Sequence, residues 1–88
     1  MITEHIKVKN EEGLHARPAS KFVKKANSYR SNIEIIFKDL RADGKSIMGV
    51  MSLGIRRGDK ITLKIDGPDE EKARQELIDF FQAGLVKS

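Results

Sequence analysis

The chain has 88 residues and a formal net charge of +4, because 17 lysines and arginines outnumber 13 aspartates and glutamates. Its length suits one small domain, residues 1–88, whose core is too small to enclose a substrate deeply. The absence of cysteine excludes a disulfide framework, and the only two histidines lack the spacing of zinc ligands, so we expect no metal and no cofactor.

The N-terminal half predicts two strands, a helix and a short third strand. Met1 to His5 lacks a signal-peptide hydrophobic region, and no apolar run approaches the ~20 residues of a membrane span, so we expect a cytoplasmic protein. Alternating apolar residues over 2–8 indicate a half-buried strand, and helical spacing over 16–26 indicates a helix that ends near Asn27. Residues 33–37 predict a second strand, and residues 40–42 predict a short third one.

The C-terminal half predicts two helices around one strand. Ser46 has the position of an N-cap for a short helix from Ile47 to about Leu53, with Gly54 as its stop. Strict alternation over 60–65 gives the clearest strand. Pro68 and the acids after it open the last helix. Its predicted core face consists of Ala73, Leu77, Phe80, Phe81 and Leu85. Together the elements follow the order β-α-β-β-α-β-α, which suits one sheet covered on one face.

The segment with the clearest chemistry is Gly-Leu-His-Ala-Arg-Pro-Ala-Ser, residues 13–20. His15 has the position of an N-cap, and Pro18 fits the first helical turn because the earliest helical N–H groups lack acceptors. The positive helix end disfavours the imidazolium and attracts an anion, and the Arg17 guanidinium matches phosphate oxygens. From His15 and Arg17 alone, the simpler interpretation is that the histidine caps the helix and the arginine is a charge exposed to solvent. The whole segment predicts a histidine that carries a phosphoryl group.

This octapeptide closely resembles the active-site signature of the HPr family, the histidine phosphocarriers of the phosphoenolpyruvate-dependent sugar phosphotransferase system. Residues 45–55, Lys-Ser-Ile-Met-Gly-Val-Met-Ser-Leu-Gly-Ile, resemble the regulatory-serine segment of the family's Gram-positive type. Ser46 follows His15 by 46 − 15 = 31 residues, which suits the family. The resemblance covers essentially the whole chain. It implies an α+β open-faced β-sandwich, in which three helices cover one face of a four-stranded, mostly antiparallel sheet.

The resemblance also implies roles for individual residues. His15 would accept phosphate from phosphorylated enzyme I and pass it to sugar-specific enzyme IIA components, with Arg17 stabilising the phosphate. The protein would then be a monomeric carrier rather than an enzyme. Ser46 would be phosphorylated by an ATP-dependent HPr kinase/phosphorylase, and its phosphoserine form would bind a catabolite-control transcription factor. On residue type alone Ser46 is only a helix cap, although a phosphate is electrostatically welcome at a helix N-terminus.

The short helix predicted from Ile47 to about Leu53 carries apolar residues on all its faces, and the core cannot bury every face of it. Core burial is the simpler interpretation for any one residue, and we expect it for Val50 and Leu53. Two methionines on one small helix are typical of an adaptable docking surface. The family resemblance assigns partner binding to Ile47, Met48 and Met51. Ser20 and Lys24 lie one and two helical turns after Ala16, so we expect them to border this patch and to take part in partner binding.

One segment departs from the family pattern. A tight Asn/Asp/Gly turn is expected directly after Phe37, but residues 38–41 come first and Asp43-Gly44 follows later, so the hairpin register stays open. Glu12 is a more acidic neighbour of His15 than the family leads us to expect. His5 is interpreted as an exposed strand residue, and residues 56–59 as a charged loop.

Three alternative functions remain. A sequence pI of about 9.5 suits a small RNA-binding domain, but the aromatic residues offer no stacking cluster on a strand, so we expect no nucleic acid partner. A phosphohydrolase using His15 and Arg17 lacks an evident second acid–base residue and a deep pocket. Within the family, a purely regulatory protein in a host without sugar permeases is the third alternative.

Overall fold

The computed structural model describes residues 1–9, 13–14 and 16–82. The candidate residue His15, together with Glu12 and Leu85, lies outside the described residues. Seven elements follow the predicted order: β1 (Ile2–Lys7), α1 (Ala16–Ala26), β2 (Asn32–Phe37), β3 (Leu40–Asp43), α2 (Ile47–Ser52), β4 (Lys60–Asp66) and α3 (Glu70–Gln82). Each predicted strand and helix is therefore present.

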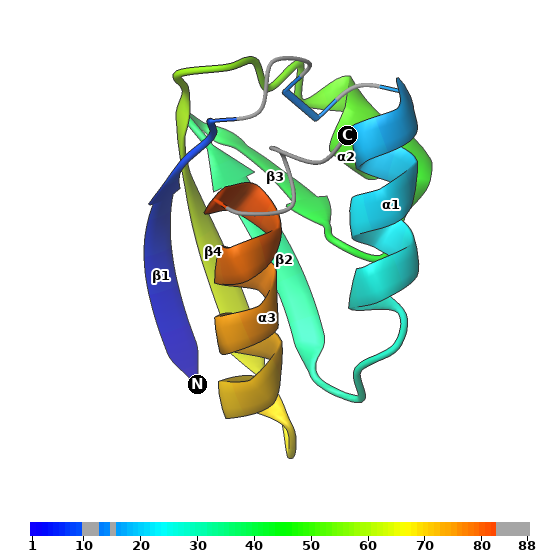
Figure 1. The fold of residues 1–88 in the computed structure, drawn as a ribbon, viewed down its shortest axis with the longest axis vertical. Coiled ribbons are helices and arrows are strands. Elements are labelled where there is room, and N and C mark those ends of the chain that lie inside the picture. Colours follow the sequence, from blue (N-terminus) through cyan, green and yellow to red (C-terminus); the bar gives the residue numbers. More distant parts are fainter. Residues whose placement is uncertain (10–12, 15, 83–88) are drawn as a thin grey trace.

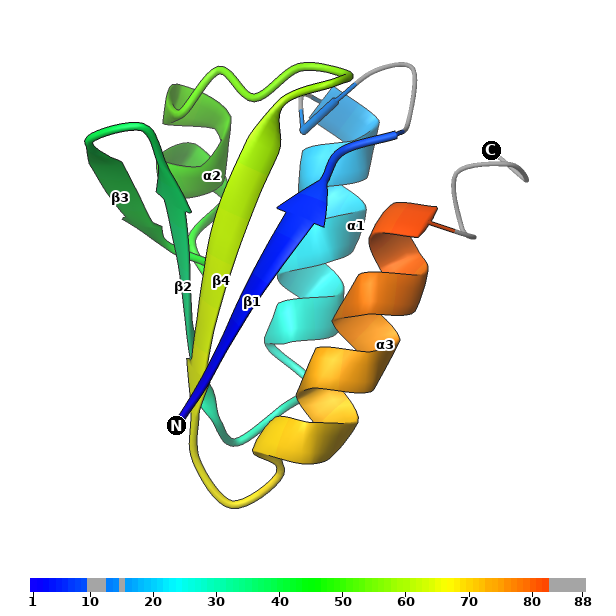
Figure 2. The ribbon, with the colours of Figure 1, turned by 90° about the vertical axis from the view of Figure 1, so that its left-hand side faces the viewer.

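The four strands form one sheet in the order β1-β4-β2-β3, and every neighbouring pair is antiparallel. β4 lies between β1 and β2, with Ile61 opposite Ile6 and Leu63 opposite Ile35. The helices cover one face of this sheet, with α1 beside α3 and α2 near β3 (Figures 1 and 2). The predicted open-faced β-sandwich is confirmed.

The core lies between the sheet and the helices. The alternating residues Ile61, Leu63 and Ile65 of β4 are 2% exposed or less, as the pattern predicted. Phe22 of α1 packs against Phe80 and Phe81 of α3, with ring centroids 5.3–5.8 Å apart within the group. These aromatic side chains join the two long helices over the sheet. Phe80 remains half-buried, whereas Phe81 is fully buried.

The tight turn between β2 and β3 does follow Phe37 directly. Phe37 pairs with Leu40, so Lys38 and Asp39 form the turn. Lys38 takes φ = 57°, a left-handed conformation uncommon for a residue with a β-carbon. This pairing fixes the register of the β2–β3 hairpin, which the sequence left open. Gly44 comes after β3, where an added β-carbon would lie 2.7 Å from Cγ2 of Ile33.

The start of α3 differs from the sequence-based prediction. Pro68 precedes the helix, which begins at Glu70, and the amide of Ala73 donates to the carbonyl of Asp69 over 3.0 Å. The Asp69 carboxylate also ties this helix start to the chain before β2. It accepts hydrogen bonds from the amides of Arg30 and Ser31 and from the Ser31 hydroxyl, at 2.6–3.0 Å.

Candidate functional site

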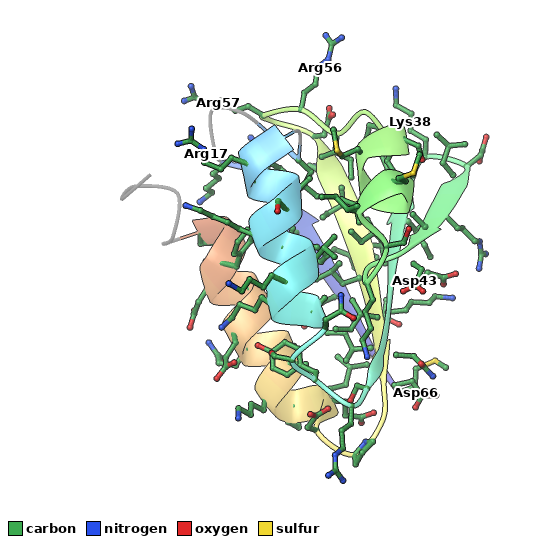
Figure 3. All side chains as sticks on the ribbon, turned by 90° about the vertical axis from the view of Figure 1, so that its right-hand side faces the viewer. Arg17, Lys38, Asp43, Arg56, Arg57 and Asp66 are labelled. Atoms are coloured by element: carbon green, nitrogen blue, oxygen red, sulfur yellow. The ribbon has the colours of Figure 1, made fainter. Side chains whose placement is uncertain are left out.

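α1 begins at Ala16, the residue that follows His15 in the sequence. Arg17 and Pro18 therefore occupy the first helical turn, as predicted. The Arg17 side chain is exposed and points outward at this end of the molecule (Figure 3). The described first turn thus presents a guanidinium beside amide groups that lack helical acceptors. The position of the His15 ring lies outside the described residues.

Two residues just before His15 are fixed against the segment that joins α2 to β4. Leu14 is fully buried, and its amide donates to the carbonyl of Ile55 over 3.0 Å. Gly13 has φ = 63°, and an added β-carbon there would lie 2.7 Å from the α-carbon of Arg56. Only glycine fits this close backbone approach in that conformation. The signature segment therefore rests on the chain around residues 55–56.

Ser46 caps the short helix α2. Its Oγ accepts a hydrogen bond from the Gly49 amide at 3.1 Å, and its carbonyl accepts one from the Val50 amide at 2.9 Å. The predicted N-cap is confirmed, and the side chain is half-buried. An added β-carbon on Gly49 would lie 3.3 Å from the Ser46 Oγ, so glycine leaves space beside the hydroxyl.

α2 divides its apolar residues between the core and the surface. Val50 and Leu53 are 0% and 5% exposed, as predicted. Ile47, Met48 and Met51 are 41%, 80% and 40% exposed. A short helix turns only one face toward the core, so it cannot bury all five of these apolar side chains. The exposed residues Ile47, Met48 and Met51 are called the α2 patch below.

The α2 patch has neighbours on both sides. α1, which carries the exposed residues Ser20 and Lys24, packs against α2 (Figure 3). On the other side α2 contacts β3, where Leu40 is 51% exposed. Leu40 was predicted only as a strand residue. Its exposure follows from the position of β3 at the sheet edge, which the sequence pattern could not reveal.

The hydrogen-bonded carboxylates with shifted pKa values lie near the start of α3 and along it. The Ser31 hydroxyl, followed by the Arg30 amide, lowers the pKa of Asp69. Burial raises the pKa of Tyr29, and its hydroxyl donates to Glu76 at 2.5 Å, which lowers the pKa of that carboxyl. These interactions hold the scaffold together at the end of α1 that is remote from Arg17.

The described surface also contains a hollow of about 400 Å³ that includes none of the predicted site residues. Its lining is Met1, Asn32, Ile33, Glu34, Asp43, Lys64 and Asp66. Figure 3 places Asp43 and Asp66 away from Arg17. Among residues 1–9, 13–14 and 16–82, no group of three or more histidine and acidic side chains could hold a metal ion. No described helix is long and apolar enough to cross a membrane.

Residues 2–83 match the protein family described as the phosphotransferase system HPr component phosphorylation site. The HPr-like protein Crh of Halalkalibacterium halodurans is 44% identical over 82 residues, which cover 93% of this chain and 98% of that protein. The phosphocarrier protein HPr of Neisseria meningitidis serogroup A is 40% identical over 79 residues, covering 90% of this chain and 89% of the relative.

Solved structures agree with these sequence matches. A crystal structure of HPr from Thermoanaerobacter tengcongensis superposes with a TM-score of 0.94 at 39% identity, covering 100% of this chain and 99% of the other. A structure described as an HPr dimer from the same organism gives a TM-score of 0.76 at 41% identity, with coverage of 91% and 92%. The described residues therefore share the fold of HPr proteins.

Proposed function

The chain belongs to the HPr family of the phosphotransferase system, and we propose that its His15 carries the phosphoryl group that the system relays. The donor is the phosphorylated first enzyme, enzyme I, and the acceptors are sugar-specific enzyme IIA components. A neutral ring nitrogen of His15 attacks phosphorus, so that a nitrogen–phosphorus bond forms while the bond to the donor breaks. Transfer to the next protein reverses these changes and restores the imidazole. The protein is a substrate of the relay rather than an enzyme.

The observation that carries this proposal is the start of α1 one residue after His15. First-turn amides and the positive helix end favour an anion at that point. The exposed Arg17 supplies a guanidinium that can bind phosphate oxygens through two parallel hydrogen bonds. Together they would stabilise a phosphoryl group on the preceding residue.

Ser46 is the proposed regulatory site, phosphorylated by an ATP-dependent HPr kinase/phosphorylase. Its Oγ already lies at the N-terminus of α2 and accepts a hydrogen bond from the Gly49 amide. A phosphate on that oxygen would add ≈ −1.5 to −2 charge without losing the helix cap. The added charge would lie next to the α2 patch. Partner choice would then change while the fold stays intact, which includes binding of a catabolite-control transcription factor by the phosphoserine form.

The proposed docking surface combines the α2 patch with Ser20 and Lys24 on α1. Exposed methionines adapt to several partners, which suits a carrier that meets both a donor and acceptors. We further propose that residues 1–88 form a single domain that works as a monomer in the cytoplasm, where phosphoenolpyruvate is formed. Related HPr chains also occur as dimers. Sedimentation of the purified protein at several concentrations tests the monomer.

The experiment that tests the carrier role uses labelled phosphoenolpyruvate, enzyme I and an enzyme IIA acceptor. Wild-type protein is expected to take up acid-labile phosphate and to pass it to the acceptor. His15→Ala is expected to do neither. His5→Ala is the matched control, because His5 is exposed on β1 and its ring makes one described side-chain hydrogen bond, to the Thr62 hydroxyl at 3.0 Å. Label on His15→Ala, or loss of label in His5→Ala, would contradict the assignment.

A second candidate function is purely regulatory, and the 44% identity to a Crh protein favours it. In that case HPr kinase/phosphorylase would label Ser46, while phosphate taken up from enzyme I would not pass on to an enzyme IIA component. Labelling the same preparation of protein with each donor in turn, followed by addition of the enzyme IIA acceptor, separates the two functions.

A further inference from the structure

Two neighbouring arginines on the segment between α2 and β4 have no role in the function proposed above. Arg56 and Arg57 are both exposed. Figure 3 shows them at the same end of the molecule as Arg17, with all three side chains directed outward. The sequence alone identified residues 56–59 only as a charged loop. The fold brings this loop to the end where α1 begins (Figures 1 and 2).

Main-chain hydrogen bonds fix the loop on both sides. The amide of Gly58 donates to the carbonyl of Val8 over 2.7 Å, and the amide of Val8 donates to the carbonyl of Asp59 over 2.8 Å. The bond from Leu14 to Ile55 holds the other side at 3.0 Å. Arg56 and Arg57 are therefore presented from a backbone whose position is set by its neighbours.

Their charges are not neutralised within the part of the chain that the structure describes. Asp59 is the nearest acid in the sequence, but its carboxylate accepts the backbone amide of Arg56 at 2.8 Å. By contrast, Arg41 and Arg74 form ion pairs with Glu34 and Glu4. The described ion pairs include no guanidinium of the loop or of the first turn of α1. Among the described residues, this end of the molecule therefore carries three guanidinium groups without an ion-pair partner.

The arginine loop packs directly against the segment that precedes the proposed phosphoryl acceptor. An added β-carbon on Gly13 would lie 2.7 Å from the α-carbon of Arg56, so the two backbones are in contact. His15 follows Gly13 by two residues, and two residues of extended chain span at most ~7 Å. The loop that carries Arg56 and Arg57 is therefore at the end of the molecule where a phosphorylated donor approaches, and its exposed charges can attract that donor over a longer range.

We propose that Arg17, Arg56 and Arg57 form a cationic rim that recognises the phosphoryl-bearing surface of the donor protein. This inference rests on the proposed function, because it takes the donor to be a protein that carries a phosphoryl group with negative charge. Arg17 binds the phosphate at the point of transfer. Arg56 and Arg57 attract the phosphorylated donor during the encounter and so increase the rate of productive docking. Charges at the edge of an interface act mainly on the association rate and its salt dependence.

The test compares two double variants that remove the same charge. Arg56→Gln/Arg57→Gln removes the two loop charges, and Arg30→Gln/Lys72→Gln removes two exposed charges at the far end, in the loop after α1 and in the first turn of α3. The measurement is kcat/KM for phosphorylation by phosphorylated enzyme I, at ~0.01 M and at ~1 M salt. Screening lengths there are about 30 Å and about 3 Å.

We expect the loop variant to lose about tenfold in kcat/KM at low salt, the lower end of electrostatic steering effects. The loss should shrink to less than about twofold at high salt, and the far-end variant should stay within about twofold of wild type throughout. Equal losses in both variants, no loss in the loop variant, or a loss that persists at high salt would each overturn the cationic rim. Wild-type protein that takes no phosphate would instead overturn the proposed function, and this inference with it.

Discussion

Ser46 illustrates how a single side chain can serve the fold and a proposed switch at once. Its Oγ accepts the Gly49 amide, which is the bond expected of an N-cap. The position of this cap was predictable, because serine directly before an apolar segment is a common helix-start signal. The crowding around Gly49 was only partly predictable, because a β-carbon added there would also lie 3.5 Å from Cβ of Ala42 in β3.

Replacing Ser46 by aspartate should separate the two roles. Ser46→Asp keeps an oxygen acceptor and adds negative charge at a helix N-terminus, so stability should hold or rise by ~0.3–1 kcal/mol. Ser46→Ala removes the cap and should cost ~0.5–2 kcal/mol. Phosphorylation of His15 should be slower in Ser46→Asp, because the added charge repels an incoming phosphoryl group. Urea midpoints and transfer rates at matched protein concentration measure both effects.

Thr3→Asp is the control for charge alone, because Thr3 is exposed near the start of β1, at the other end of the molecule from the start of α1. It should leave the transfer rate unchanged. If Ser46→Asp is phosphorylated at the wild-type rate, Ser46 is a helix cap without a regulatory effect on His15.

At the scale of elements, the strands and helices with strict periodicity were predicted well. β4 alternates without a break, and α1 ends at Ala26, one residue before the predicted end. The β2–β3 turn could not be predicted from residue types, because Lys38 is a poor candidate for φ = 57°. Pairing of the hairpin imposes that conformation, so the register depends on contacts beyond the turn itself. For the same reason the pattern could not show that β3 leaves Leu40 half exposed.

The division of α2 between core and surface gives a second prediction. Leu53→Ala should cost ~2–5 kcal/mol of stability, because it deletes buried aliphatic atoms and leaves a cavity. Met48→Ala and Met51→Ala should cost far less, since these side chains are 80% and 40% exposed. The methionine variants should instead weaken binding to enzyme I. Urea midpoint and apparent affinity are measured on each variant.

Gln75→Ala is the matched control, because Gln75 has an unbranched side chain of similar length and is exposed on α3. It should change neither quantity appreciably. Methionine variants of α2 that bind enzyme I as tightly as wild type would show that partners dock elsewhere.

At the scale of the whole molecule, carboxylates near the start of α3 join segments that are distant in sequence. Asp69 accepts hydrogen bonds from Arg30 and Ser31, and Glu70 accepts the Gly67 amide and the N-terminal amine. The sequence identified these acids only as favourable first-turn residues. The local sequence pattern does not reveal the partners of these acids. It also does not show that Arg17, Arg56 and Arg57 lie at the same end of the molecule. Both features depend on contacts between segments that are distant in sequence.

These contacts predict loss of stability in acid. The pKa values of Asp69, Glu70 and Glu76 are lowered in the folded protein, chiefly by the Ser31 hydroxyl, the Gly67 amide and the Tyr29 hydroxyl respectively. Their contribution is therefore complete above the ordinary values of 3.8 for Asp and 4.5 for Glu. It is lost as the pH falls through the lowered values. The urea midpoint should decrease steadily below about pH 4.5.

Asp69→Asn should lower the midpoint at neutral pH and reduce its decrease in acid. Asp39→Asn, in the exposed β2–β3 turn, is the control and should keep the wild-type pH dependence. An Asp69→Asn variant with the full wild-type decrease would show that Asp69 does not contribute to acid sensitivity.

The most direct test of the central claim is to locate the phosphoryl group after incubation with phosphoenolpyruvate and enzyme I. Protein digested at alkaline pH, which preserves phosphohistidine, is mapped by mass spectrometry. The account predicts the added phosphoryl mass on the peptide that contains His15, with loss of that mass on brief acid treatment. It predicts none on the peptide that contains Ser46. Phosphate that resists acid, or that maps to any residue other than His15, would contradict the assignment of this chain as a histidine phosphocarrier.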